Sequence, residues 1–186
     1  MEYAGGISCN SGKYAIGEWL IAHTPLNGEV LDIGAGAGTY AVLLQQYPVE
    51  IDAVEAFEPS IQYIIDKYRT IYCVDICKFQ YLQNYDTIIM GDVLEHLSAE
   101  DGPRVVKEAL EHCRYLMVAV PFTYEQGAIA NNTYEIHRQT DLNFKVMAER
   151  YPELHLLMYF DTIVQAGDAI EPIQYAYYYA KGALDE

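Results

Sequence analysis

A short apolar run that breaks into three evenly spaced glycines constrains this chain more than any other stretch. Residues 30–40 read VLDIGAGAGTY. The apolar residues at the start predict a buried strand, because the run is too short for a helix. Gly34, Gly36 and Gly38 allow positive φ angles and let a ligand approach the backbone closely. A helix that begins after the turn would point its free N–H groups at that ligand, so the stretch predicts a site for a nucleotide or nucleoside cofactor.

The spacing of this turn separates two classes of cofactor. The dinucleotide fingerprint G-x-G-x-x-G needs its third glycine three residues after the second, where this chain has Thr39. Asp32, two residues before the first glycine, would be unfavourable beside a pyrophosphate but is compatible with a cationic, phosphate-free cofactor. The pattern D-x-G-x-G-x-G resembles the first motif of the class I S-adenosylmethionine-dependent methyltransferases. That resemblance implies an S-adenosylmethionine site that includes Asp32, Gly34, Ala35, Gly36 and Gly38. An ordinary glycine-rich strand–helix turn is the alternative for this motif taken alone.

Strands and helices alternate along the chain. Apolar runs of strand length occur at residues 30–33, 51–54, 70–74, 85–90, 115–120, 154–160 and 173–180. Helical spacing is found at residues 13–23, 40–47, 59–65, 98–112 and 141–151. This alternation predicts a parallel sheet with right-handed crossovers, and the last two strands, joined by a turn with Gly167, predict an antiparallel hairpin. The expected fold class is therefore α/β, a doubly wound, Rossmann-like, seven-stranded sheet that is mostly parallel and has an antiparallel C-terminal edge.

We expect one domain over residues 1–186, since a chain of this length is most simply one domain. Residues 1–12 are predicted to lead into the first helix and to fold over the cofactor. The glycines in residues 5–13 do not have phosphate-loop spacing, so that function is rejected. Residues 121–140 are the least regular part of the chain and follow the fifth strand, which predicts a loop on the substrate side of the sheet.

Acids follow the second and third predicted strands. Glu55 lies 23 residues after Asp32 (55 − 32), about the separation of a ribose-binding acid in such folds. Glu58 is a competitor, although its position is typical of a helix start. Asp75 corresponds to an acid that, in the resembled family, accepts a hydrogen bond from the adenine amino group while an apolar neighbour, here Ile76, packs on the ring. A solvated strand-end carboxylate and an ordinary turn aspartate are the alternatives for each acid taken alone.

The fourth predicted strand ends in a turn that reads GDVLEH at residues 91–96. This segment resembles the part of small-molecule methyltransferases that lies under the methionine portion of the cofactor. The resemblance implies that Gly91 and Asp92 contact the cofactor and that His96 lies near the transferred methyl group. The DNA amino-methyltransferase signature Asn/Asp-Pro-Pro-aromatic is lacking here, and the Pro-Cys nucleophile of cytosine-C5 enzymes is lacking after the fifth strand, so DNA methylation is disfavoured.

The substrate-side loop contains the other candidate catalytic residues. Residues 131–137 read NNTYEIH, and together with VEAFEP at residues 54–59 they extend the resemblance to a subgroup of bacterial and archaeal methyltransferases. Transfer to an alcohol or phenol is helped by a base, and His137, His96 and Glu135 are the candidates. A structural role in the strand–helix turn for His96, or at a helix entry for His137, is the alternative.

Composition limits the partners. The chain has 27 acidic and 11 basic residues, a formal net charge of −16, which disfavours broad nucleic-acid binding. The four cysteines have neither C-x-x-C nor zinc spacing, so we expect reduced thiols, no metal and a cytoplasmic location. Neither a membrane span nor a signal segment is predicted. The 18 tyrosines and the apolar last strand leave room for a homodimer.

The function expected from the sequence is methyl transfer from S-adenosylmethionine to an oxygen or nitrogen of a small or medium-sized acceptor. Two alternatives stay open. One is a catalytically silent protein that binds the cofactor as a partner or regulatory subunit. The other is a nicotinamide-dependent oxidoreductase, against which Thr39 and Asp32 both argue.

Overall fold

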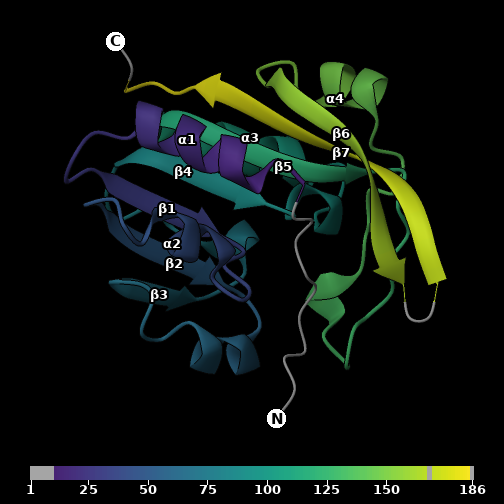
Figure 1. Cartoon of the computed structure of the whole chain (residues 1–186), viewed down its shortest axis with the longest axis horizontal. Coiled ribbons are helices and arrows are strands. Elements are labelled where there is room, and N and C mark those ends of the chain that lie inside the picture. The colour runs from purple at the N-terminus through teal and green to yellow at the C-terminus, as the bar shows by residue number, and fades with distance from the viewer. Residues whose placement is uncertain (1–10, 167–168, 185–186) are drawn as a thin grey trace.

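One mixed sheet organises the molecule. The structure is a computed structural model that describes residues 11–166 and 169–184. Its seven strands have the order β3-β2-β1-β4-β5-β7-β6 (Figure 1). They are β1 (Glu29–Ile33), β2 (Glu50–Glu55), β3 (Thr70–Cys73), β4 (Tyr85–Gly91), β5 (Cys113–Phe122), β6 (His155–Ala166) and β7 (Ala169–Lys181). The first five are parallel, and β7 pairs antiparallel with both β5 and β6. The predicted fold class is confirmed.

Helices cover both faces of this sheet. The α-helices are α1 (Lys13–His23), α2 (Thr39–Leu44), α3 (Asp101–Glu111) and α4 (Phe144–Arg150). The 3₁₀ helices are η1 (Glu58–Tyr63), η2 (Ile76–Lys78), η3 (Leu94–His96) and η4 (Thr133–Glu135). Successive strand residues point to opposite faces, and Val30 packs with α1 and α2 while Leu31 packs with α3 and α4. Within the described residues, none of these helices is long and apolar enough to span a membrane.

The connection after β3 positions the site. The chain builds β2 and β3 on one side of β1, then crosses to build β4 and β5 on the other side. In open sheets of this kind, a crevice forms beyond the carboxyl ends of the two strands where the order reverses. The loops that follow β1 and β4 therefore flank the expected binding site.

Several predicted element boundaries were wrong. The helix predicted at residues 59–65 is the 3₁₀ helix η1, in which Ser60 N–H bonds to Phe57 and Ile64 N–H bonds to Ile61. The helix predicted from residue 141 begins later, because the Asn143 side chain accepts hydrogen bonds from Lys145 N–H and Val146 N–H. Strands β6 and β7 extend further than predicted, since the two pair with each other along their length. The predicted turn residue Gly167 and residues 1–10 of the predicted lead-in (residues 1–12) lie outside the described residues.

Candidate active site

A cavity of about 700 Å³ lies at the carboxyl ends of the parallel strands. Residues after β1, β2, β3 and β4 form one side of it, and the loop after β5 forms another. A volume of this size is within the range of pockets that bind drug-sized ligands. Most of the predicted cofactor and catalytic residues therefore line one space, although they come from segments far apart in the sequence.

The glycine turn forms the floor nearest β1. Gly34, Gly36 and Gly38 have φ angles of 72°, 51° and 79°, a conformation that favours glycine. A Cβ at Gly34 would lie 2.5 Å from the Val93 Cγ2 atom, so a side chain there would need the chain to move. Gly34, Ala35 and Gly36, which were predicted to bind the cofactor, line the cavity. Gly38 does not; it precedes α2 and packs against Lys67 instead.

Asp32 also departs from the cofactor-binding role expected of it. Its side chain is 1% exposed and does not line the cavity. The Tyr68 hydroxyl donates a hydrogen bond of 2.5 Å to its carboxylate. Burial raises the pKa of Asp32 to about 7, although the Tyr68 hydrogen bond and the charge of Lys13 both act to lower it. Asp32 is therefore a buried residue of β1, and its carboxylate is bonded to Tyr68 rather than exposed to the cavity.

The predicted acids at the ends of β2 and β3 do reach the cavity. Glu55, 8% exposed at the end of β2, accepts hydrogen bonds from Gly36 N–H at 2.8 Å and Phe57 N–H at 2.7 Å. Its burial raises the pKa of its carboxyl, and the backbone hydrogen bonds oppose this change. Asp75 follows β3, accepts a hydrogen bond from Cys77 N–H at 2.9 Å and lines the cavity beside Ile76. The competitor Glu58 begins η1 and does not line the cavity.

The turn after β4 holds an aspartate in an unusual conformation. Asp92 has a φ of 57°, which is uncommon and costly outside glycine. Its Oδ1 atom accepts a hydrogen bond of 2.6 Å from the Tyr175 hydroxyl, whereas its buried Oδ2 atom has no hydrogen-bond partner among the described residues. Gly91 and Asp92 both line the cavity, and a Cβ at Gly91 would collide with the Tyr40 ring.

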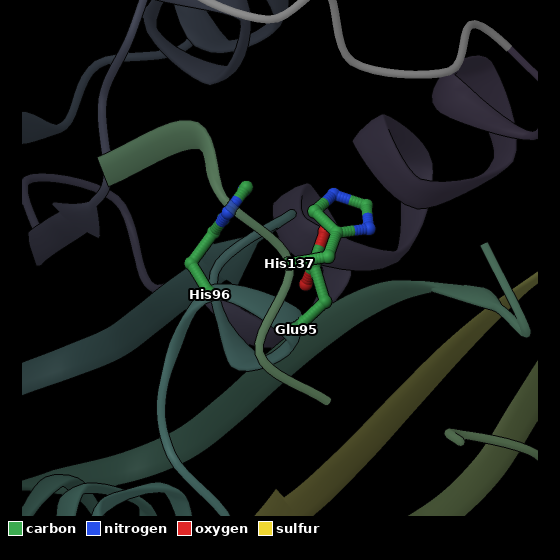
Figure 2. A group of neighbouring side chains, drawn as sticks. All are labelled: Glu95, His96 and His137. Atoms are coloured by element: carbon green, nitrogen blue, oxygen red, sulfur yellow. The ribbon is translucent and has the colours of Figure 1, made fainter. Parts of the chain in front are cut away.

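Glu95, His96 and His137 lie together on the cavity wall (Figure 2). The first two come from η3, and the third comes from the loop after β5. Glu95 is 1% exposed, and neither of its carboxylate oxygens has a hydrogen-bond partner among the described residues. The two imidazole rings meet edge to face with centroids 4.8 Å apart.

Backbone carbonyls orient both imidazoles. His96 Nδ1 lies 3.3 Å from the Ile136 carbonyl, and His137 Nδ1 lies 2.8 Å from the Tyr124 carbonyl. A carbonyl oxygen can only accept, so in both rings Nδ1 carries the proton and the neutral ring has its free lone pair on Nε2. Burial lowers the pKa of His96 to about 4 and also lowers the pKa of His137, so both rings are neutral at pH 7.

The third base predicted from sequence, Glu135, is half-buried on the same wall. Its carboxylate accepts hydrogen bonds of 3.3 Å from the side-chain amides of Gln126 and Asn132. The loop is fixed further by His137 N–H, which bonds to the Gln126 carbonyl at 3.0 Å. All three predicted bases therefore face one cavity.

Sequence reasoning missed an aromatic group beside these residues. Tyr40 from α2 and Tyr175 from β7 both line the cavity. The buried Lys13 Nζ bonds to the Tyr40 hydroxyl at 2.9 Å and lies 5.8 Å from the centre of the Tyr175 ring. Tyr175 is 83 residues from the Asp92 that it contacts, and no local pattern could have indicated that pairing.

Solved structures share this fold at low sequence identity. TehB from Haemophilus influenzae has a TM-score of 0.66 and 17% identity; the match covers 92% of this chain and 62% of TehB, so this chain spans less than two thirds of that protein. An S-adenosylmethionine-dependent methyltransferase from Clostridium acetobutylicum has a TM-score of 0.66 and 12% identity, with 93% and 92% covered. The N-terminal domain of EvdMO1, solved with S-adenosylhomocysteine bound, has a TM-score of 0.65 and 9% identity, with 94% and 82% covered.

The sequence itself identifies the family. A comparison with curated protein sequences finds no significant match. The methyltransferase domain family, in contrast, matches residues 15–155, which contain the glycine turn, the strand-end acids and the substrate-side loop. This match confirms the resemblance drawn from the motifs. The chain belongs to the methyltransferase domain family.

Proposed function

We propose that this protein transfers a methyl group from S-adenosylmethionine to an oxygen or nitrogen of a small or medium-sized acceptor. One observation carries the proposal: the glycine turn, the strand-end acids and three candidate bases line one cavity at the switch point of the sheet. S-adenosylhomocysteine bound to the similarly folded EvdMO1 domain supports this donor.

The residues that line the cofactor half of the cavity come from the carboxyl ends of β1, β2, β3 and β4. Gly34 and Gly36 let the cofactor approach the backbone, and Glu55 accepts its ribose hydroxyls. Asp75 accepts from the adenine amino group while Ile76 packs on the ring. Asp92, one of whose buried oxygens has no hydrogen-bond partner in the described part of the chain, faces the methionine part.

The acceptor half is lined by the loop after β5. Tyr124, Tyr134 and Glu135 give this wall aromatic and polar surface. When bound, S-adenosylmethionine supplies an electrophilic methyl group with a neutral leaving group. The protein then has to position the acceptor in line with that methyl and accept one proton. His137 and His96, both neutral at pH 7, offer Nε2 lone pairs for this proton.

Release of S-adenosylhomocysteine from a metabolite panel tests this function. On an acceptor found in that way, we expect His137→Ala to lower kcat by about 100-fold or more, the usual contribution of a positioned base. His155→Ala is the matched control, because His155 is an exposed residue of β6 outside the cavity. If His137→Ala and His96→Ala both turn over at the wild-type rate, the base assignment is wrong. Cofactor binding without turnover across the panel would instead favour the catalytically silent alternative.

A further inference from the structure

We propose that Glu95, His96 and His137 form a binding site for one divalent transition-metal cation on the acceptor side of the cavity. Each side chain offers one ligand atom, and the three atoms lie within 4.8 Å of one another (Figure 2). Two imidazole nitrogens and one carboxylate oxygen are a donor set typical of Zn²⁺, Fe²⁺, Mn²⁺ and Co²⁺.

The surroundings of Glu95 favour a bound cation. A carboxylate that is 1% exposed should have hydrogen-bond donors, yet both of its oxygens lack a partner among the described residues. Lys13 contributes a favourable charge, but its Nζ atom bonds to the Tyr40 hydroxyl. Asp92 lies close enough to make the local potential more negative, and its own buried Oδ2 atom has no partner within residues 11–166 and 169–184. A bound cation would satisfy this group of acceptors, whereas the alternative is a protonated Glu95.

The histidines are held as metal ligands usually are. A ligating imidazole commonly donates its other ring N–H to a backbone carbonyl or a carboxylate, which fixes the tautomer and aims the free nitrogen. His96 makes this contact with Ile136, and His137 makes it with Tyr124. Both rings therefore use Nδ1 as the donor and leave Nε2 free to bind a cation.

Binding requires a small contraction of the cluster. Ligand atoms about 2.1 Å from one ion lie at most about 4.2 Å apart and about 3.4 Å apart in a tetrahedral site, so a separation of 4.8 Å must close by at least roughly 0.6 Å. The irregular loop that carries His137 supplies this movement, whereas Glu95 and His96 lie on the short helix η3 after β4. Three protein ligands leave positions open toward the cavity, as in catalytic rather than structural metal sites.

The open positions specify the acceptor class. Resting on the proposed function, we assign the site to an acceptor that coordinates the ion through a hydroxyl oxygen, because a metal lowers the pKa of a bound hydroxyl. With an ion bound, the histidine Nε2 atoms would coordinate it, and the ion would take over from the histidines the activation of the acceptor hydroxyl. No metal was expected from the sequence because the cysteines lack the spacing of a metal site. This cluster contains no cysteine, and it brings together residues about 40 positions apart in the sequence.

Metal titration of the purified full chain tests the site without cofactor or acceptor. After treatment with a chelator, the wild type should bind one Co²⁺ or Mn²⁺ per chain, measured by calorimetry and by the visible spectrum of Co²⁺. Glu95→Gln and, independently, His96→Ala should weaken binding by more than about 100-fold, since loss of an outer partner alone costs about 10–100-fold. His155→Ala is the matched control, because it removes an exposed histidine outside the cavity and leaves the cluster and all the cysteines in place. It should bind the metal ion as the wild type does.

Two results would overturn the metal site: no stoichiometric binding by the wild type, or binding that the cluster variants leave unchanged while thermal unfolding shows that they are folded. Neither result bears on methyl transfer, which is measured by release of S-adenosylhomocysteine. Conversely, a cation that binds to a chain without methyltransferase activity would keep the site and remove only the assigned acceptor class.

Discussion

Replacing Glu55 with glutamine should weaken the binding of S-adenosylhomocysteine by roughly 100-fold. The carboxylate is expected to accept both ribose hydroxyls, and a hydrogen bond to a charged group contributes about 1.5–3 kcal/mol. Glutamine keeps the size of the side chain but removes the charge and one acceptor oxygen. The carboxylate also accepts hydrogen bonds from the backbone N–H groups of Gly36 and Phe57. The glutamine NH₂ group would face one of these donors and could not accept from it. Isothermal titration of the wild type and the variant measures the difference.

Glu58→Gln is the matched control for this measurement. Glu58 is an exposed acid three residues later, at the start of η1 and outside the cavity, so its variant should bind S-adenosylhomocysteine as the wild type does. Thermal unfolding of both variants separates lost affinity from lost folding. Equal affinity of Glu55→Gln and the wild type would refute the ribose assignment.

The second large effect concerns stability. Asp32→Asn should stabilise the fold at neutral pH by up to about 4 kcal/mol, because the folded pKa of about 7 lies roughly three units above the ordinary value of 3.8. Asparagine removes the cost of ionising a fully buried carboxyl, and its side-chain oxygen can still accept from the Tyr68 hydroxyl. Since Asp32 does not line the cavity, affinity for S-adenosylhomocysteine should change little.

The pH dependence of this stabilisation has a defined sign. Between about pH 4 and pH 7 the unfolded chain releases the Asp32 proton that the folded chain retains, so the free energy of unfolding of the wild type falls as the pH rises. Below that range both states are protonated, and wild type and variant should be equally stable. Urea unfolding at pH 4, 5.5 and 7.5, values chosen to span this window, measures the difference. A variant less stable than the wild type at pH 7.5 would contradict this account.

Much of the fold could be predicted because its strands carry local signals. Buried parallel strands are short, continuous apolar runs, and β1 to β5 all appear as such runs. The hairpin strands were predicted too short, since the parts beyond the predicted ends contain polar residues such as Asp161 and Glu171, which pair across the two strands. The η1 segment was predicted as a regular helix, because its apolar spacing does not show whether hydrogen bonds will span three residues or four.

The site could be predicted where the topology places strand ends together. Glu55 and Asp75 follow neighbouring parallel strands, so their meeting at one edge required only the fold. Asp32 could not be placed, because its environment depends on Tyr68, 36 residues away. Glu95 was within a recognised motif but was not selected, since the loop that covers it is distant in sequence; Arg138 N–H and Gln139 N–H both bond to the Glu95 carbonyl.

The most direct test of the account is isothermal titration of the purified wild-type chain with S-adenosylhomocysteine and, separately, with NADH. We expect saturable binding of one S-adenosylhomocysteine per chain and no binding of NADH. Binding of NADH without binding of S-adenosylhomocysteine would contradict it, and would assign the glycine turn to a nicotinamide-dependent oxidoreductase.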